Sequence, residues 1–461
     1  MGVFTQFLGF LLCLSFLIFT HELGHYLFAR LFKARVDKFY LFFNPKFSIL
    51  RAKKFGGKWH FNFFSPAPPE EWKEHPEHTE WGIGWIPLGG YCSINGMVDE
   101  TTSASDLPAE PQPYEFRSKP AWQRFFIIVG GVVVNFLSAL IIYPLILFTW
   151  GKEYIPAANA TYGFQFTEIG KNAGFQDGDK ILMLDGDTVH LLSKFNDRVL
   201  IDGAKTVVVN RNGETVTVHL PDDFPQQILA SGDFLFCDFN FPFVIDSVMP
   251  SSPANKGGLL KGDSLVAIDE VPYISFLRMQ ELLVENKNEE ITVDIYRNSE
   301  LLQKTIQLDS TAKFGVFPKH FSQFLKVEKE EYTLIQSVPA GISAAVNKLG
   351  MYVRQFKLIA TKEGAKQLGG FLTIGNIFPK TWNWERFWNM TAFLAIILAF
   401  MNILPIPGLD GGYTMFILVE MITRRKPSDK FLTYANTVGF TLLILLLLYA
   451  NGMDIFRFFI K

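Results

Sequence analysis

The N-terminal segment of the chain is too apolar for a soluble protein. From Gly2 to Thr20 there is no acidic or basic residue, and the apolar run resumes at Tyr26–Ala29 after a short polar interval. A helix needs about 20 apolar residues to cross the ~30 Å hydrocarbon layer of a bilayer. No small-residue cleavage site follows the run, which favours a retained membrane helix over a signal peptide that is removed. The segment therefore predicts an integral membrane protein.

Hydrophobic residues make up 49% of the 461-residue chain and concentrate in a few long runs. Four runs are long enough to cross a bilayer as helices, at approximately Val3–Phe28, Phe125–Trp150, Phe387–Met421 and Phe431–Ala450. The formal net charge of −2 provides no basic excess for binding nucleic acid. The three cysteines form no C-x-x-C pair, so neither a zinc ribbon nor a disulfide framework is implied. We expect a polytopic α-helical membrane protein.

Three polar side chains lie inside the first run, in the sequence His21-Glu22-Leu23-Gly24-His25. On a helix, His21 and His25 are four positions apart and project from one face, so they can share a metal ion with Glu22 beside them. Such groups are costly in a membrane and persist there mainly where they bind metal, relay protons or pair. A chance H-E-x-x-H pattern is the alternative, and the charge-free surroundings disfavour it. The segment indicates metal-dependent proteolysis in or at the bilayer.

Two histidines do not complete a catalytic zinc site, which usually has three protein ligands and one open position. The metzincin extension of the motif needs glycine at position 28 and histidine at position 31, where the chain has Phe28 and Leu31. A thermolysin-like glutamate a short helix downstream is also missing from the sequence, since residues 26–69 contain no glutamate. The remaining acidic side chain well inside an apolar run is Asp410.

Asp410 follows a predicted break in the third run. Pro405 and Pro407 remove helical N–H donors and favour extended backbone. Broken backbone at membrane depth is tolerated only where protein or a water-filled cavity satisfies its polar groups. Because Asp410 comes directly after the break, beside Gly411 and Gly412, it is well suited to reach a metal held on another helix. The alternatives are that it pairs with a lysine or caps the following half-helix.

Basic residues predict the orientation of the four runs. They follow the first run at Lys33, Arg35, Lys38, Lys46, Arg51, Lys53, Lys54 and Lys58, and the third at Arg424, Arg425 and Lys426. We therefore expect both of these connections in the cytoplasm, and the N-terminus and the large region between the second and third runs outside it. His21, His25 and Asp410 then lie toward the cytoplasmic ends of their helices.

The region between the second and third runs contains two copies of one pattern. Each copy has a short helical turn, a Gly-Asp turn at Gly178-Asp179 or Gly262-Asp263, and an alternating apolar strand. This pattern resembles PDZ domains, which accept an extended peptide by strand addition. Another kind of small β-barrel is the alternative. The usual Gly-Leu-Gly-Phe-type carboxylate loop is not visible in either copy, so capture of a free C-terminus is less secure than the fold.

The loop after the first run is predicted to be partly folded. Phe39–Leu50 and Trp59–Phe64 have the composition of strands, and Trp85–Gly96 that of a glycine-punctuated strand or hairpin. Residues 65–80 are rich in proline, glutamate and histidine and look like a surface insertion, to which the sequence assigns no role.

A second metal site at His75 and His78 is disfavoured, because a proline breaks the helical register there and the surroundings are charged.

Between Ala340 and Lys366 apolar residues recur at spacings of three and four, which predicts an amphipathic helix. This helix lies in the membrane interface or packs on the β-rich modules, and the sequence favours neither.

Together these motifs resemble those of the site-2 protease family (peptidase family M50), most closely its bacterial RseP-like zinc metalloproteases. The resemblance rests on H-E-L-G-H in the first run, Asn402-x-x-Pro-x-Pro-x-Leu-Asp410-Gly in the third and PDZ-like modules between the second and third. Pro87–Tyr91 resembles the family's membrane-associated β-hairpin, and Gly131-x-x-x-Asn135 its second-helix motif. The chain departs from the family at Val132, where a proline is usual. It also departs before the third run, where the family's Gly-Pro-Ile-type motif is replaced by the sequence Leu368–Gly375.

The resemblance implies an intramembrane zinc metalloprotease with Zn²⁺ as cofactor. His21, His25 and Asp410 would hold the zinc ion, and Glu22 would act as general base and acid. Further substrate-binding residues are implied, namely Asn402, Gly89, Gly90 and Tyr91. Ligand type alone would also admit other first-row metal ions.

The implied partners are single-span membrane proteins, of the anti-sigma-factor or signal-peptide-remnant type, and the lipid bilayer of a bacterial inner membrane. Two alternatives remain: a membrane-associated metalloprotease that cuts soluble segments near the surface, and a non-catalytic PDZ adaptor. The expected domains are a first membrane helix (1–30), a cytoplasmic loop with a membrane-associated β-hairpin (31–120), a second membrane helix (121–150), PDZ-like domains (151–235 and 236–337), an amphipathic helix and linker (338–386), and two further membrane helices (387–424 and 425–461).

Overall fold

The computed structural model describes residues 2–97, 110–231, 236–272, 276–359, 361 and 369–460. The chain forms two compact units, described separately below. The first comprises Met1–Gly151, Glu331–Val353 and Leu368–Lys461, and the second comprises Lys152–Glu330 and Arg354–Gln367.

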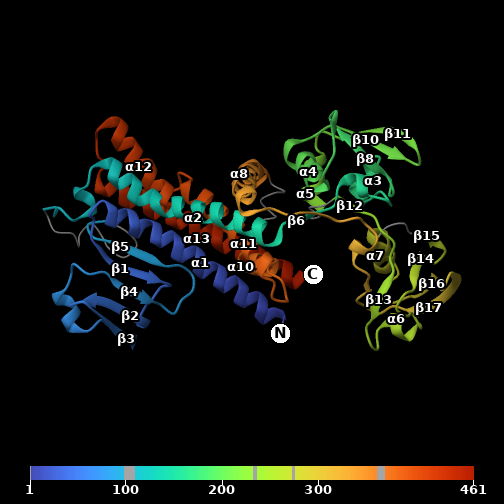
Figure 1. Ribbon diagram of the computed structural model, residues 1–461, viewed down its shortest axis with the longest axis horizontal. Coiled ribbons are helices and arrows are strands. Elements are labelled where there is room, and N and C mark those ends of the chain that lie inside the picture. The colour runs from blue at the N-terminus through green and yellow to red at the C-terminus, as the bar shows by residue number, and fades with distance from the viewer. Residues whose placement is uncertain are drawn as a thin grey trace. The chain divides into compact units, whose positions relative to one another are not determined.

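The first unit contains four helices that are long and apolar enough to cross a bilayer, as expected. They are α1 (Gly2–Leu31), α2 (Ala121–Trp150), α11 (Trp384–Ile403) and the part Tyr434–Arg457 of α13 (Asp429–Ile460). These helices run side by side in Figure 1. The four membrane spans predicted from hydropathy are therefore confirmed at the level of length and composition.

Helices α1 and α2 cross at backbone contact. A Cβ atom at Gly24 would lie 2.2 Å from the carbonyl oxygen of Gly130, and one at Gly130 would lie 2.7 Å from the carbonyl oxygen of Gly24. Small residues allow membrane helices to approach this closely. The crossing lies within the H-E-x-x-H motif, so it brings α2 directly against the two histidines.

The third predicted run is two helices rather than one. Helix α11 ends at Ile403 and α12 (Asp410–Thr423) begins after six residues without regular structure. A Cβ at Gly439 of α13 would lie within 1.7 Å of the carbonyl oxygen of Pro407, so the break packs against α13 at a point where only glycine fits. Protein thus covers the broken backbone, as required at membrane depth.

A five-stranded sheet follows α1 in the chain. Its strands are β1 (Val36–Leu41), β2 (Ser48–Phe55), β3 (Lys58–Ser65), β4 (Glu80–Ile83) and β5 (Tyr91–Ile94), in the order β3-β2-β4-β1-β5. The predicted single strand at Phe39–Leu50 is wrong: positive φ angles at Phe42 and Lys46 turn the chain between β1 and β2. Within Trp85–Gly96 the regular structure is β5, an edge strand paired with β1.

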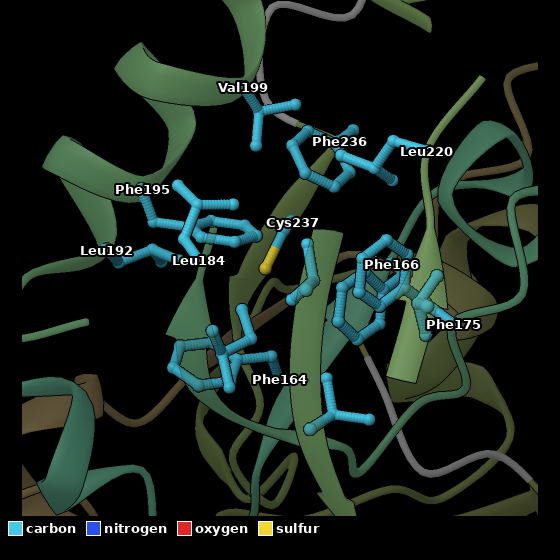
Figure 2. Close-up of a cluster of buried hydrophobic side chains, with 14 of the residues drawn as sticks. Phe164, Phe166, Phe175, Leu184, Leu192, Phe195, Val199, Leu220, Phe236 and Cys237 are labelled. Carbon is cyan, nitrogen blue, oxygen red and sulfur yellow. The ribbon is translucent and has the colours of Figure 1, made fainter. Parts of the chain in front are cut away.

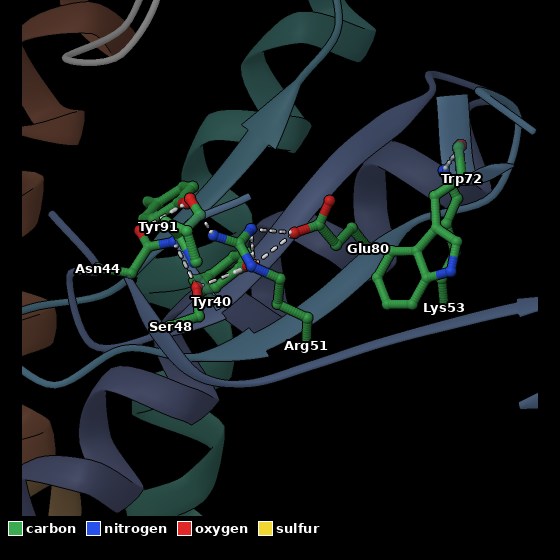
Figure 3. A network of polar contacts seen from close by, with 9 residues as sticks. Tyr40, Asn44, Ser48, Arg51, Lys53, Trp72, Glu80 and Tyr91 are labelled. Carbon is green, nitrogen blue, oxygen red and sulfur yellow. Dashed lines mark hydrogen bonds and ion pairs between the residues drawn. The ribbon is translucent and has the colours of Figure 1, made fainter. Parts of the chain in front are cut away.

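The predicted insertion at 65–80 covers one face of this sheet. It contains the short helix η1 (Glu70–Glu74), and its Trp72 is buried. Lys53 Nζ of β2 donates a hydrogen bond to the Trp72 carbonyl at 2.8 Å. Beneath it, Arg51 Nη1 donates to Glu80 Oε1 at 2.7 Å and to the Tyr40 hydroxyl at 2.8 Å (Figure 3). Burial, together with the nearby Glu80 carboxylate, raises the pKa of the Tyr40 phenol.

The predicted amphipathic helix is present as α8 (Leu334–Ile359), and positions 360 and 362–366 lie outside the described residues. Within the first unit α8 packs on α2, where a Cβ at Gly341 would lie 2.3 Å from the Pro144 nitrogen. This contact with a membrane helix is one that the sequence did not suggest. The short helix α10 (Phe371–Ile377) follows, and Asp454 of α13 accepts hydrogen bonds from the backbone N–H groups of Gly370 and Thr373 near its start.

The second unit contains two β-rich modules with corresponding sheets, β11-β10-β8-β9 and β17-β16-β14-β15. The first module has β7 (Phe164–Phe166), α3 (Glu168–Asn172), β8 (Lys180–Leu184), β9 (Asp187–Thr188), α4 (Leu192–Asp197), β10 (Thr206–Arg211), β11 (Glu214–His219), α5 (Phe224–Ser231) and β12 (Cys237–Phe239). The second has β13 (Ile245–Val248), α6 (Pro253–Lys256), β14 (Ser264–Ile268), β15 (Val271–Pro272), α7 (Phe276–Glu285), β16 (Glu290–Arg297), β17 (Glu300–Gln307) and β18 (Val316–Pro318). Outside both, β6 (Lys152–Tyr154) pairs with β19 (Glu328–Glu330).

Each module has its own core and the same buried ion pair at its Gly-Asp turn. Phenylalanines dominate the first core, with Phe164, Phe166 and Phe236 almost fully buried (Figure 2). Arg211 of β10 binds the Asp179 carboxylate through two nitrogens and also donates to the Gly174 carbonyl. In the second module Arg297 makes the same contacts with Asp263 and Gly258. The repeated Gly-Asp pattern in the sequence therefore corresponds to the same arginine–aspartate ion pair in both modules.

Candidate metal centre

Two histidines of α1 and an aspartate nearly 400 residues later converge between α1 and α12. The Nε2 atoms of His21 and His25 lie 3.3 Å apart, and Asp410 Oδ2 lies 3.1 Å from the first and 3.3 Å from the second. Among the described residues this is the one group of three or more histidine, cysteine or acidic side chains whose ligand atoms all lie within 4.8 Å of one another. The structure thus brings together the three residues that the sequence selected as metal ligands.

The spacing and chemistry of these atoms fit a zinc ion. Ligand atoms bound at 2.0–2.1 Å in a tetrahedral site lie about 3.3 Å apart, which matches the triangle formed here. Asp410 Oδ2 is buried and has no hydrogen-bond donor, although a buried carboxylate oxygen normally has one. A metal ion would satisfy this atom. The side chains of His21 and Asp410 keep 14% and 23% of their exposure, so the group is not fully enclosed by the described residues.

Backbone contact with α2 orients His25. Its Nδ1 lies 3.0 Å from the carbonyl oxygen of Ile127, to which a protonated Nδ1 donates a hydrogen bond. This fixes the tautomer whose Nε2 carries a free lone pair. His25 is therefore held with Nε2 directed toward His21 and Asp410.

Asn135 of α2 orients His21 in the same way. Its amide group lies 3.3 Å from His21 Nδ1 and 2.8 Å from the Thr20 hydroxyl, and the residue is fully buried. The oxygen and nitrogen of such an amide are assigned from the surrounding hydrogen bonds. The Thr20 hydroxyl donates to the Phe16 carbonyl, so it is free to accept from the amide nitrogen. The structure places the Asn135 nitrogen toward His21 Nδ1 and the oxygen toward Thr20. With the amide turned by 180°, the Asn135 oxygen accepts from His21 Nδ1, which leaves Nε2 free to bind metal.

Gly131 of α2 lies directly beneath both imidazole rings. A Cβ at this position would lie 2.6 Å from His25 Nε2 and 2.7 Å from His21 Cε1. We expect Gly131→Ala to weaken zinc binding by about ten- to hundredfold, the usual effect of disturbing groups that orient metal ligands. Competition with a fluorescent zinc chelator would measure this.

Gly452→Ala on α13 is the matched control, because a Cβ there meets open space. It should keep the affinity of the unmodified protein. Equal affinities in the two variants would mean that the rings tolerate displacement by a methyl group.

Helix α12, which begins at Asp410, is held at both ends. At its start a Cβ on Gly411 would lie 2.1 Å from the Leu404 carbonyl oxygen, so the helix packs tightly on the preceding break. Near its C-terminal end Glu420 accepts a hydrogen bond from Arg124 Nη2 of α2 at 2.5 Å, and both side chains are largely buried. Because α2 also orients both histidines, one helix sets the positions of all three ligands.

Glu22 and the chain before β5 lie close together. A Cβ at Gly90 would lie 3.5 Å from Glu22 Cγ and 2.7 Å from Ile18 Cγ2 of α1. The glycine at position 90 therefore allows the sheet to approach α1 at the level of the histidines. Glu22 itself neighbours His21 in the sequence.

The other predicted substrate-binding residues lie at the end of α11 and in the chain that leads into β5. Asn402 is buried near the end of α11, just before the break. Gly89 packs against the Phe43 ring, and the Tyr91 hydroxyl donates to Asn44 Oδ1 at 3.0 Å. The side chain of Tyr91 is thus engaged within the sheet.

Sequence reasoning missed what orients the ligands. It identified Gly131 and Asn135 only as parts of a motif, without a role, and it did not select Thr20 or Ile127. A polar residue and adjacent glycines inside an otherwise apolar helix, at Gly130, Gly131 and Asn135, were the available signal. Interpreting it required the helix crossing.

Comparison with known sequences gives one consistent family. A sequence model of peptidase family M50 matches residues 9–66 and 67–446. A Ralstonia nicotianae protein whose name describes it as a zinc metalloprotease is 25% identical, over 98% of both chains. A Neisseria meningitidis protein with the same description is 24% identical, again over 98% of both chains. The regulator of sigma E protease of Haemophilus influenzae is 23% identical, over 97% of this chain and 98% of its own.

Proposed function

This chain belongs to peptidase family M50 and is a zinc metalloprotease of the site-2 protease type, and we propose that it hydrolyses peptide bonds within or beside the transmembrane segments of other membrane proteins. The observation that carries the proposal is the location of the candidate metal centre. Its two histidines belong to a helix long and apolar enough to cross a bilayer, and its carboxylate follows a second such helix after the six-residue break. A substrate bond must therefore reach membrane depth to be cut.

We assign the metal ligands as His21, His25 and Asp410, with Zn²⁺ as the ion. When bound, zinc lowers the pKa of a water molecule to about 7 and polarises a carbonyl group. The protein holds the two imidazoles in the tautomer with Nε2 free, through the Ile127 carbonyl and the Asn135 amide. It supplies the third ligand from the first residue of α12.

Proton transfer is assigned to Glu22. Its carboxylate takes a proton from the attacking water and later gives a proton to the leaving amine. The position directly after His21 puts it beside the ligands without making it one. A purely structural metal site would have no use for such a base.

Substrate binding is assigned to β5. Among the strands that the structure describes, β5 stands at the end of its sheet, next to β1, and an edge strand is where an extended segment can add to a sheet. Gly89, Gly90 and Tyr91 lead into that edge, and Gly90 lies close to Glu22. A transmembrane substrate must unwind before cleavage, and strand pairing replaces the helical hydrogen bonds that it loses. Asn402 is proposed to hold substrate backbone from the other side of the centre.

The cleavage position tests this function. Purified protein in vesicles should cut a single-span substrate at a bond inside, or within a few residues of, its apolar segment, as identified by mass spectrometry of both products. A second candidate function, cleavage of soluble segments near the membrane surface, predicts bonds well outside that segment. Cleavage only at such outer bonds would replace the proposed function with this second one.

We further propose that the second unit contains two PDZ domains and lies outside the cytoplasm. The corresponding sheets of its two modules support the domain assignment, and the basic residues after α1 and α12 support the orientation. A reporter enzyme that is active only outside the cytoplasm should work when fused at Gly213 or Asp263 and fail at Lys54 or Arg425. Activity at Lys54 would contradict the orientation.

The substrate class is proposed from the family. Single-span proteins of a bacterial inner membrane, such as anti-sigma factors or the remnants of signal peptides, have the one apolar helix that this centre requires. The Haemophilus influenzae relative carries the name regulator of sigma E protease. Comparing membrane proteomes of cells with the unmodified protein and with a Glu22→Gln variant would identify the substrates, as proteins that accumulate in the variant.

A further inference from the structure

A buried ion pair joins α12 to α2. Arg124 Nη2 of α2 lies 2.5 Å from Glu420 Oε1 of α12, and the two side chains keep only 8% and 16% of their exposure. The two helices pack against each other in this part of the first unit (Figure 1). A second donor of the same guanidinium, Nε, binds the Lys119 carbonyl oxygen at 3.0 Å. Arg124 is therefore held from two sides at the position from which it binds α12.

The polar contacts around Arg124 continue to the end of α1. Lys119 Nζ donates a hydrogen bond at 3.1 Å to the carbonyl oxygen of Lys33, which lies just after the last residue of α1. This group of contacts thus connects α1, α2 and α12. These are the helices that carry the two histidines, the groups that orient the histidines, and Asp410.

Apolar packing alone does not fix how α12 lies along α2. Ile417 of α12 shares one apolar cluster with Ile127 and Ile128 of α2. Beyond it, Val419 and Ile422 are exposed, so this part of α12 has few neighbours among the described residues. Apolar contacts are non-directional, whereas a hydrogen-bonded ion pair has a defined geometry. The ion pair is therefore suited to set the position of α12 along α2.

A small shift of α12 would be large at the metal centre. Glu420 and Asp410 belong to the same helix, and about 15 Å of helix axis separates them. A slide of α12 by one residue would move Asp410 by ~1.5 Å. Zinc–ligand distances tolerate deviations of only about 0.2 Å. Such a slide would thus take the Asp410 carboxylate out of reach of an ion held by the histidines.

We propose that Arg124 and Glu420 are positioning residues for the metal centre: their ion pair fixes α12 on α2 so that Asp410 reaches the zinc ion. The inference rests on the proposed role of Asp410 as a ligand. A buried charge that loses its partner is strongly unfavourable, so neutralising Glu420 would make Arg124 seek another acceptor and would release α12. The pair acts on the ion only through Asp410.

Zinc affinity, measured by competition with a fluorescent chelator, tests the proposal. Glu420→Gln and Arg124→Gln should each weaken zinc binding by about ten- to hundredfold, the usual effect of losing a group that orients a metal ligand. With Co²⁺ in place of zinc, the visible absorption bands of the bound ion should also change, because they report ligand geometry.

Glu80→Gln is the matched control. It breaks the buried Arg51–Glu80 pair, whose nitrogen and oxygen lie 2.7 Å apart in the sheet after α1, on strands that carry no proposed metal ligand (Figure 3). It should keep the zinc affinity and the cobalt spectrum of the unmodified protein. Unchanged affinity in Glu420→Gln, or equal weakening in Glu80→Gln, would overturn the proposal.

The double variant Arg124→Met/Glu420→Met separates positioning from stability. Replacing both partners of a buried ion pair by apolar residues is often neutral or stabilising for the fold. Its thermal unfolding should therefore resemble that of the unmodified protein, while its zinc affinity stays weak because methionine makes no directional contact. Full affinity in this variant would contradict a positioning role. Failure of the ligand assignment itself is a separate result, since Asp410→Ala would then retain zinc.

Discussion

Glu22→Gln should leave the zinc content of the purified protein unchanged while lowering the rate of peptide hydrolysis by about two to four orders of magnitude, the usual contribution of a general acid–base group. Glutamine has nearly the same shape as glutamate but cannot take up the proton. Zinc should stay because the convergent atoms belong to His21, His25 and Asp410. The measurement pairs metal analysis with cleavage of a single-span substrate in vesicles.

Zinc content and hydrolysis rate, measured on the same variant, distinguish a role of Glu22 in metal binding from a role in proton transfer. Loss of zinc together with activity would mean that Glu22 holds the centre and does not move protons. Turnover close to that of the unmodified protein would remove Glu22 from the mechanism. The pH profile gives a further check, because the limb that reports the base should disappear in the variant.

Asp410→Ala should behave differently, losing both zinc and activity. Removing one of three ligands leaves two imidazoles, and the orphaned Oδ2 that now lies 3.1 Å and 3.3 Å from the histidine nitrogens disappears. His21→Ala and His25→Ala should give the same result, although they lie at the other end of the chain. Metal content after dialysis against a weak chelator would measure the loss.

Asp454→Ala provides a matched control for this experiment. Asp454 is also a buried carboxylate in a membrane helix, α13, but it accepts hydrogen bonds from Gly370 and Thr373 and lies outside the metal group. This variant should keep its zinc. Full zinc occupancy in Asp410→Ala, with the histidine variants empty, would mean that another residue supplies the third ligand.

The membrane helices and the metal group could be predicted because both depend on local or strongly constrained signals. Long apolar runs leave few alternatives to a membrane helix. His21 and His25 are related by helical spacing alone. Asp410 was found by elimination, since few acids lie inside apolar runs. Its proximity to the histidines then depends on the path of α12, which no local pattern specifies.

The strands between α1 and α2 were harder to predict, because no local pattern specifies how they pair. Sheet order depends on long-range pairing, and β4 lies between β1 and β2 although it follows both in sequence. The turn between β1 and β2 relies on left-handed backbone at Phe42 and Lys46, residues that seldom adopt it. The composition of segment 65–80 is that of a surface insertion. Its one tryptophan, Trp72, is nevertheless buried and packs the segment on the sheet.

The position of Asp410 also gives the metal a mechanical role. Its partners His21 and His25 lie roughly 385 residues earlier, so a bound ion ties together the two ends of a very long chain loop, and the entire second unit lies within that loop. A bound zinc ion would therefore link α1 to α12. Its binding energy would contribute to the free energy that holds these helices together. Stripping the ion would therefore loosen α12, so the short segment 424–428 should become a site of proteolytic nicking in the chelated protein before any other part of the first unit unfolds.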